Sequence, residues 1–288
     1  MNASASASTS AVDILIPTRD RAASLAITLT ALHAQSLRDF RVIVSDQSEQ
    51  ASAFDAPEVK ALLRIIAAGG RPVETHRHLP RRGLSEQRAF LLSRSTAPYC
   101  LFLDDDVVTE PDLIDRMLQV IRREQCGFIG SALHGLSFID DVRPHQQAIK
   151  FWDTRVVPET VGLRSPEWER HHLHSAANLF HLQNRLGLGR GQCRLYRVAW
   201  VGGCVLFDTE KLRAAGGFDF WCDLPVEHCG EDVLVQLRVM QRFGGCGMIP
   251  SGAYHLELPT TVGVRDINAP FVFWSRPDEE QSASAGVG

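Results

Sequence analysis

Three consecutive carboxylates follow one of the most apolar short segments of the chain. Residues 99–103 have the composition of a buried strand, and Asp104, Asp105 and Asp106 come directly after them. Like charges this close repel one another unless a cation or a polar ligand offsets them. Because Mg²⁺ and Mn²⁺ bind carboxylate oxygens and often keep phosphate oxygens as further ligands, the cluster predicts a metal–phosphate site. The alternative is an acidic loop between a strand and a helix.

Two further positions carry side chains suited to chemistry. Glu231 and Asp232 follow Gly230 at the start of a predicted helix. The helix dipole favours negative charge there, so an acidic first turn is the structural alternative to a catalytic carboxylate. His255 follows a turn, and a lone histidine is more often a packed or surface residue than a metal ligand. Neither position identifies an activity by itself.

A strand–helix–strand unit at the start of the chain would place loops beside these carboxylates. Residues 12–16 form a short apolar run that Pro17 ends, and leucines follow at helical spacing from Leu25 to Leu32. A second strand-like run over 41–44 is halted by polar residues. The unit predicts a parallel sheet, and ligands of such sheets bind at the carboxyl ends of the strands.

The remaining pattern continues this α/β organisation. It predicts helices over 83–95, 167–186, 210–215 and 233–240, strands over 127–133 and 200–207, and weaker strands over 62–67 and 73–76. Thr109 and Asp112 have the spacing of a capping box, so we expect a helix to begin there, with Thr109 as its cap. The stretch from Asp140 to Val198 breaks the rhythm of strands and is rich in His, Arg and Trp.

Composition limits the class of protein. The 288 residues carry a formal net charge of −4, with no basic excess that would suggest a nucleic-acid partner. No apolar run approaches the roughly 18 residues of a transmembrane segment, and the Ala/Ser-rich start lacks the features of a signal peptide. The seven cysteines form no C-x-x-C pair, which favours reduced thiols and a cytoplasmic location. We expect one domain over 11–274, with disordered tails over 1–10 and 275–288.

Taken in order, these motifs resemble those of the family 2 glycosyltransferases of the GT-A fold, and the match spans most of the chain. The opening strand with Pro17, Thr18 and Arg19 resembles the first strand and the nucleotide-contacting loop of the family. The second strand resembles the one whose terminal acidic residue contacts the base, which implies that role for Asp46; Ser45 stands where the family usually has another aspartate.

The later motifs of the family have counterparts as well. Gly83 and Arg88 fall where the family has a Gly and an Arg on the helix before the metal motif, and the aspartate cluster matches its D-x-D motif. Gly202 and Gly203 resemble its small-residue strand at the acceptor pocket. Glu231 and Asp232 resemble its E-D motif, whose aspartate is the catalytic base, and His255 falls where many members have a further metal ligand.

The resemblance implies a single GT-A domain, a Rossmann-like α/β fold with a central, mostly parallel sheet. Residues 11–135 would bind the nucleotide-sugar and residues 136–274 the acceptor. The implied reaction is a metal-dependent, inverting transfer of a sugar, by expectation a hexose, from a nucleotide-diphosphate donor to an acceptor hydroxyl. A UDP-sugar is the favoured donor, and the acceptor is a glycan, a lipid-linked molecule or a small molecule. Mn²⁺ or Mg²⁺ would bind Asp106 and His255, with Asp104 and Asp105 facing the donor and Glu231 facing the acceptor.

Several alternatives stay open at this point. Asp104 also fits the nucleophile motif of haloacid-dehalogenase-type phosphatases, although that nucleophile follows the first strand of its fold. An inactive GT-A-like binding domain is the other alternative, although the metal and base positions are intact. The four histidines His171, His172, His174 and His181 do not share one helix face, which favours a solvated or acceptor-facing surface over a metal cluster. Trp168 could stack on a sugar ring, with packing as its alternative.

Overall fold

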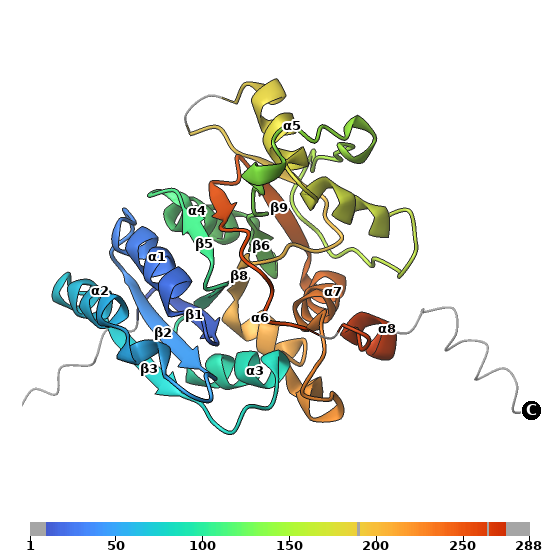
Figure 1. Ribbon diagram of the computed structural model, residues 1–288. Helices are drawn as coiled ribbons and strands as arrows, with labels where there is room; N and C mark the ends of the chain where they lie inside the picture. The colour runs from blue at the N-terminus through green and yellow to red at the C-terminus, as the bar shows by residue number, and fades with distance from the viewer. Residues whose placement is uncertain (1–9, 189–190, 264, 275–288) are drawn as a thin grey trace, which may run out of the picture.

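The computed structural model describes residues 10–188, 191–263 and 265–274 and shows an eight-stranded mixed sheet flanked by helices (Figure 1). The strand order is β3-β2-β1-β4-β8-β6-β9-β7, and β5 and β10 form a separate pair. The strands are β1 (Val12–Thr18), β2 (Phe40–Asp46), β3 (Val73–Arg77), β4 (Tyr99–Leu103), β5 (Val107–Thr109), β6 (Phe128–Gly130), β7 (Arg194–Tyr196), β8 (Cys204–Asp208), β9 (Gly245–Ile249) and β10 (Ala253–His255). The helices are α1 (Ala22–His33), α2 (Pro57–Ala68), α3 (Leu84–Arg94), α4 (Leu113–Glu124), α5 (Asn178–Leu186), α6 (Thr209–Ala214), α7 (Glu231–Phe243) and α8 (Ala269–Phe273). The predicted tails lie outside the described residues, except for Ser10.

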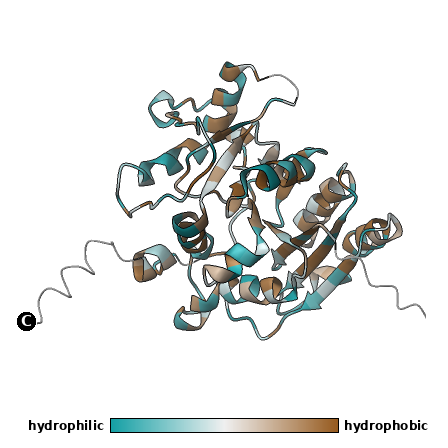
Figure 2. Ribbon diagram, turned by 180° about the vertical axis from the view of Figure 1, so that it is seen from behind, coloured by the Kyte–Doolittle hydropathy of each residue, from teal (hydrophilic) through white to brown (hydrophobic). Residues whose placement is uncertain are grey.

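Alternating side chains explain why helices cover both faces of the sheet. In β1, Ile14 and Ile16 pack in a core that α1, α2 and α4 share, whereas Leu15 packs in a second core with α3, α6 and α7. Figure 2 shows hydrophobic strands and helices that carry both hydrophobic and hydrophilic residues, as amphipathic helices do. The predicted α/β class is confirmed.

The direction of the strands determines which loops meet. The four strands β3, β2, β1 and β4 pair in parallel, so their carboxyl ends lie at one edge. β8 runs antiparallel to β4, and therefore begins at the edge where β4 ends. The residues before β8 consequently lie beside the aspartate cluster, and the Asp104 amide donates to the Gly203 carbonyl at 2.9 Å.

The small β5–β10 pair brings a distant part of the chain to the same edge. β5 directly follows the aspartate cluster, and β10 pairs with it antiparallel, with His255 opposite Val107. The Leu256 amide then donates to the carbonyl of Asp106 at 2.9 Å. This pairing places His255 next to Asp106, although the two residues are 149 positions apart in the chain (255 − 106).

Two local predictions are wrong. Residues 62–67 belong to helix α2 and are not a strand, because Val59 and Ile66 are buried seven positions apart while Ile65 is 46% exposed, which is helical spacing. Thr109 does not cap a helix. It ends β5, its hydroxyl accepts a hydrogen bond from Gln35 at 3.0 Å, and α4 begins four residues later.

The predicted helix over 167–186 is also wrong as one element. Residues Trp168–His174 form a 3₁₀ helix, the chain extends at Ser175, and Ala176 adopts a left-handed conformation with φ of 51° before α5 begins. A left-handed residue cannot continue a right-handed helix, and a residue with a β-carbon rarely adopts this conformation. Ala176 therefore separates the 3₁₀ helix from α5. Among the described residues, no helix is long and apolar enough to cross a membrane.

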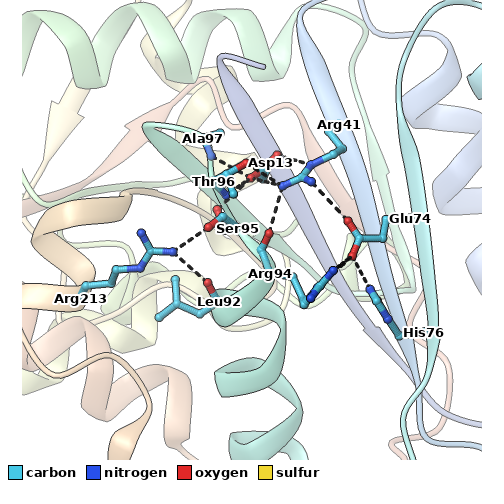
Figure 3. Close-up of polar contacts among 10 residues, drawn as sticks. All are labelled: Asp13, Arg41, Glu74, His76, Leu92, Arg94, Ser95, Thr96, Ala97 and Arg213. Atoms are coloured by element: carbon cyan, nitrogen blue, oxygen red, sulfur yellow. Dashed lines mark hydrogen bonds and ion pairs between the residues drawn. The ribbon is translucent and has the colours of Figure 1, made fainter. Parts of the chain in front are cut away.

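A polar network closes the amino-terminal end of the parallel strands (Figure 3). Asp13 on β1 is buried and accepts from Arg41 Nε and Nη2 at 2.9 and 2.8 Å. It also accepts from Ser95, Thr96 and Ala97, on the segment that leads into β4. These bonds tie three parallel strands together at the edge opposite the aspartate cluster.

Candidate functional site

A cavity of about 500 Å³ lies at the carboxyl edge of the parallel strands. It contains five carboxylates, from Asp104, Asp105, Asp106, Glu231 and Asp232. Four arginines also line it, namely Arg19, Arg21, Arg88 and Arg265. Charges of both signs thus face one space, although they come from loops and helices spread over 246 positions of the chain (265 − 19).

Asp106 is held between two basic side chains. Its Oδ2 atom lies 2.6 Å from Arg21 Nη1 and 3.4 Å from His255 Nε2. Burial by itself would raise the pKa of Asp106, but the bond and charge of His255 and the Arg21 guanidinium lower it overall. The same contact with Asp106 raises the pKa of His255. Asp106 is therefore the member of the cluster that is best held in its charged form.

Asp105 has a different environment. Its carboxyl group is 6% exposed and accepts a short hydrogen bond from Thr18 Oγ1 at 2.6 Å. Burial, together with the neighbouring charge of Asp106, raises the pKa of Asp105 to about 7. Arg21 reaches it at 3.4 Å. For Asp105, burial thus outweighs the hydrogen bond from Thr18 and the charge of Arg21.

Arg88 connects the aspartate cluster to the start of α7. Its Nη2 donates to Asp104 at 2.9 Å, and its Nε lies 3.1 Å from Glu231 Oε1. Burial and the charge of Glu231 raise the pKa of the adjacent Asp232 to about 7, against the lowering effect of Arg88. A carboxylate with a pKa near neutrality, lining a cavity, is suited to accept a proton.

A second cavity of about 520 Å³ adjoins the first. The two share Asp104, Trp200, His255 and Leu258. Gly202 and Gly203 line the second cavity, together with His171 and His174. Gly203 has φ of 75°, and a β-carbon there would come within 2.4 Å of Leu133, so a larger residue does not fit.

The structure places most of the predicted site residues together, but not all of them. Pro17, Thr18 and Arg19 line the first cavity with the five carboxylates and His255. Asp46 and Gly83 are not among the described residues that line it. Asp46 is fully buried and accepts from Ser48 N, Ser52 Oγ and Ala53 N, so its carboxylate folds the loop after β2. Gly83, with φ of 99°, starts α3 against the carbonyl of Val226.

The sequence interpretation missed three parts of the site. They are Arg21, Arg265 and the segment 258–262, which forms one wall of the first cavity. Arg19 and Arg21 donate to the carbonyls of Thr261 and Pro259 in that segment. Arg21 could have been noticed as a second basic residue in the loop after β1. The 258–262 segment has no sequence motif that would identify it, because it binds Arg19 and Arg21 through backbone carbonyls, which every residue has. Trp168 also lines this cavity, as its stacking interpretation requires.

The donor set fits a hard divalent cation. Asp106 and His255 offer an adjacent carboxylate and imidazole, and His255 lies on the side of Asp106 that faces the cavity. Among the described residues, no three or more His, Cys, Asp or Glu side chains are arranged to hold a metal by themselves. Two protein ligands leave room for phosphate oxygens and water, which is how Mg²⁺ is usually bound.

Comparisons with known proteins show the family of this chain. The model of the family "Glycosyl transferase family 2" matches residues 13–201, which confirms the resemblance inferred from the motifs. A search of curated sequences finds no significant match.

Solved structures confirm the predicted GT-A fold. The S. aureus protein TarS (residues 1–349) in complex with UDP-GlcNAc has a TM-score of 0.55 at 12% identity, covering 87% of this chain and 60% of that one. The mannosyltransferase PcManGT from Pyrobaculum calidifontis, in complex with GDP-Man and Mn2+, has a TM-score of 0.50 at 15% identity, covering 83% of this chain and 56% of that one. The present chain thus covers less than two thirds of the TarS chain and of the PcManGT chain.

Proposed function

Because the chain belongs to glycosyl transferase family 2, we propose that it transfers a sugar, by expectation a hexose, from a nucleotide-diphosphate donor to an acceptor hydroxyl. The observation that carries this proposal is that two cavities share Asp104, while Asp106, His255 and Asp232 all line the first of them. A phosphatase that uses Asp104 as its nucleophile is set aside by the family match and by the place of Asp104 after the fourth strand in the chain.

The donor occupies the first cavity in this proposal. Pro17 and Thr18 end β1 and Arg19 follows them, at the edge where parallel sheets bind ligands, so these three residues can contact the nucleotide. TarS and PcManGT bind UDP-GlcNAc and GDP-Man. A UDP-sugar is our favoured donor. Direct contact between Asp46 and the base, which the family pattern suggests, requires the loop after β2 to release this carboxylate.

The leaving diphosphate gains negative charge as the glycosidic bond breaks, and positive groups must offset it. Mn²⁺ or Mg²⁺, held by Asp106 and His255, would act as a Lewis acid on the phosphate oxygens. PcManGT is described with Mn2+. Arg19 and Arg21 line the same space and add fixed positive charge to it. Asp105, bonded to Thr18, keeps the loop after β1 beside the cluster.

The acceptor enters through the second cavity in this proposal. Gly202 and Gly203 leave its wall open beside Asp104, and Trp200 lies where the two cavities join. Asp232 takes the proton of the attacking hydroxyl, because its raised pKa near 7 makes it a competent base at neutral pH. Attack from the face opposite the diphosphate inverts the anomeric centre. Arg88 holds Asp104 and also Glu231, the residue before Asp232 in α7.

A thermal-shift panel tests the donor assignment. Each nucleoside diphosphate is added to the full chain with and without Mn²⁺, and the preferred nucleotide raises the melting temperature by mass action. We expect UDP with Mn²⁺ to give the largest shift. The matching nucleotide-sugar is then incubated with candidate glycan, lipid-linked and small-molecule acceptors. Nucleotide binding without any sugar transfer would support an inactive binding domain, and no nucleotide binding would refute the proposed function.

A further inference from the structure

Arg21 makes two contacts that no other described side chain of the cavity combines. Its Nη1 lies 2.6 Å from Asp106 Oδ2 and 3.4 Å from Asp105 Oδ1. Its Nη2 donates to the carbonyl of Pro259, in the segment that walls the cavity. The side chain is only 15% exposed, so these contacts are made with little screening by water. One guanidinium thus joins the aspartate cluster to the 258–262 segment.

The contact with Asp106 uses the oxygen that a metal ion would need. His255 Nε2 approaches Asp106 at Oδ2, so a cation bound between these two groups takes Oδ2 as its ligand. A divalent cation requires oxygen ligands at about 2.0–2.1 Å for Mg²⁺. Two positive charges on one oxygen repel each other strongly at such distances. Arg21 and a divalent cation therefore compete for Asp106 Oδ2.

We propose that Arg21 is a built-in competitor of the divalent cation, a positioning residue that holds Asp106 until the metal displaces its guanidinium. The displaced group stays in the first cavity, where it faces the donor's diphosphate. This proposal rests on the proposed function for the existence of the metal site. It adds that the chain's own arginine determines how tightly the free enzyme binds the metal.

The neighbouring arginines provide the contrast. Arg88 pairs with Asp104 and Glu231, and not with Oδ2 of Asp106. Arg19 lines the same cavity and donates to the same wall segment, at Thr261, but its carboxylate partner is Asp20, at 3.9 Å. Arg19→Gln is consequently a matched control. It removes the same charge from the same cavity and the same kind of bond to the wall, and leaves Asp106 untouched.

The test is a titration of the full chain with Mn²⁺ alone, in which electron paramagnetic resonance measures free Mn²⁺. Arg21→Gln should bind Mn²⁺ roughly tenfold more tightly than the wild type, within the usual range of coupling between groups that compete through one site. Arg21→Lys restores a cation and should return the affinity toward that of the wild type. Arg19→Gln should stay near the wild type, and Asp106→Asn should abolish binding.

The outcomes separate this inference from the proposed function. If the wild type binds Mn²⁺, Asp106→Asn does not, and Arg21→Gln binds equally or more weakly, the competition is refuted while the metal site stands. An equal gain in Arg19→Gln would also refute it, because the effect would then be one of net charge. If no form binds Mn²⁺, both the competition and the proposed metal site are refuted.

Discussion

The parallel strands carry buried carboxylates at both ends, and their surroundings differ. At the amino-terminal end, Asp13 accepts five hydrogen bonds (Figure 3). Burial would raise the pKa of Asp13, but Arg41 and the backbone donors lower it overall. At the carboxyl end, burial and neighbouring negative charge raise the pKa values of Asp105 and Asp232 to about 7.

This difference indicates what each end contributes. A buried carboxylate that accepts several hydrogen bonds and has a cationic partner stabilises the folded state, because unfolding exchanges those contacts for water. A buried carboxylate with a raised pKa is destabilised in its charged form, and such groups cluster at sites that bind cations or transfer protons. The same substitution, Asp to Asn, should therefore have opposite consequences at the two ends.

The largest effect is expected for Asp232→Asn. A general base contributes about 10² to 10⁴ in rate, so turnover should fall by that factor while donor affinity and the melting temperature at neutral pH do not fall. Turnover is measured with the donor that the nucleotide panel identifies. Asp55→Asn, at an acidic side chain that is 68% exposed and outside both cavities, is the control. Full turnover in Asp232→Asn would refute the assignment of the base.

The corresponding change at the other end, Asp13→Asn, should cost stability and not turnover. It removes the closer of the two carboxylate partners of the half-buried Arg41 guanidinium and leaves only Glu74, and an amide cannot accept all the bonds that the carboxylate accepts. We expect the free energy of unfolding to fall by about 2–4 kcal/mol. Urea denaturation measures this change, and donor affinity below the unfolding transition should match that of the wild type. A loss of donor binding without a loss of stability would contradict the comparison.

The pH dependence of stability should also differ between the two ends. The lowered pKa of Asp13 means that its stabilisation is complete above the unfolded pKa of about 3.9 and is lost as the pH falls through the folded value. The raised pKa of Asp232 has the opposite sign, because the folded state holds its proton up to about pH 7. Relative to the wild type, Asp232→Asn should thus be equally stable near pH 4 and progressively more stable as the pH rises to 8. Urea denaturation from a pH below the folded pKa of Asp13 up to pH 8 measures both trends, and a parallel trend for the two variants would contradict them.

Turnover should follow the ionised fraction of the same group. Below pH 7, a growing share of Asp232 carries a proton and cannot accept another, so the rate should fall about tenfold per pH unit once the pH is well below the pKa. Above pH 7 this dependence should level off. A rate profile that is flat from pH 5 to 8 would show that Asp232 does not titrate in this window.

How far the sequence predicts these regions depends on the kind of signal. The strand over 99–103 was predicted with its correct bounds because it is apolar throughout and ends at charged residues. Thr109 was misassigned because its spacing to Asp112 fits a capping box, whereas pairing with β10 makes it part of a strand. That pairing joins segments about 150 positions apart, so no local pattern reports it.

In the site, too, local motifs could be read from the sequence, whereas contacts between distant segments could not. The aspartate cluster, Asp232 and His255 were found from motifs, and the structure brings them to one cavity. Asp46 looked like a ligand-contacting residue, but only the folded loop shows that its oxygens bond to Ser52 and Ala53. Arg21 went unnoticed because its partners are a carboxylate 85 positions away and a backbone carbonyl 238 positions away. Contacts of this kind depend on topology and not on residue type.

The smallest effect is expected at the rim of the amino-terminal network, for Arg94→Ala. Arg94 is 48% exposed and donates to Glu74 Oε1 through Nε and Nη2, at 2.9 and 2.7 Å. Water screens such a pair, and Glu74 keeps Arg41 and His76 as partners after the substitution. The free energy of unfolding should fall by at most about 1 kcal/mol, and by less in 1 M salt. Comparing the loss of unfolding free energy in Arg94→Ala with that in Asp13→Asn, in the same urea series, shows which residues of the amino-terminal network supply its stabilisation. Equal losses would indicate that the charges of the whole network supply the stabilisation, whereas the expected several-fold difference would assign most of it to the buried carboxylate of Asp13 and its five hydrogen bonds.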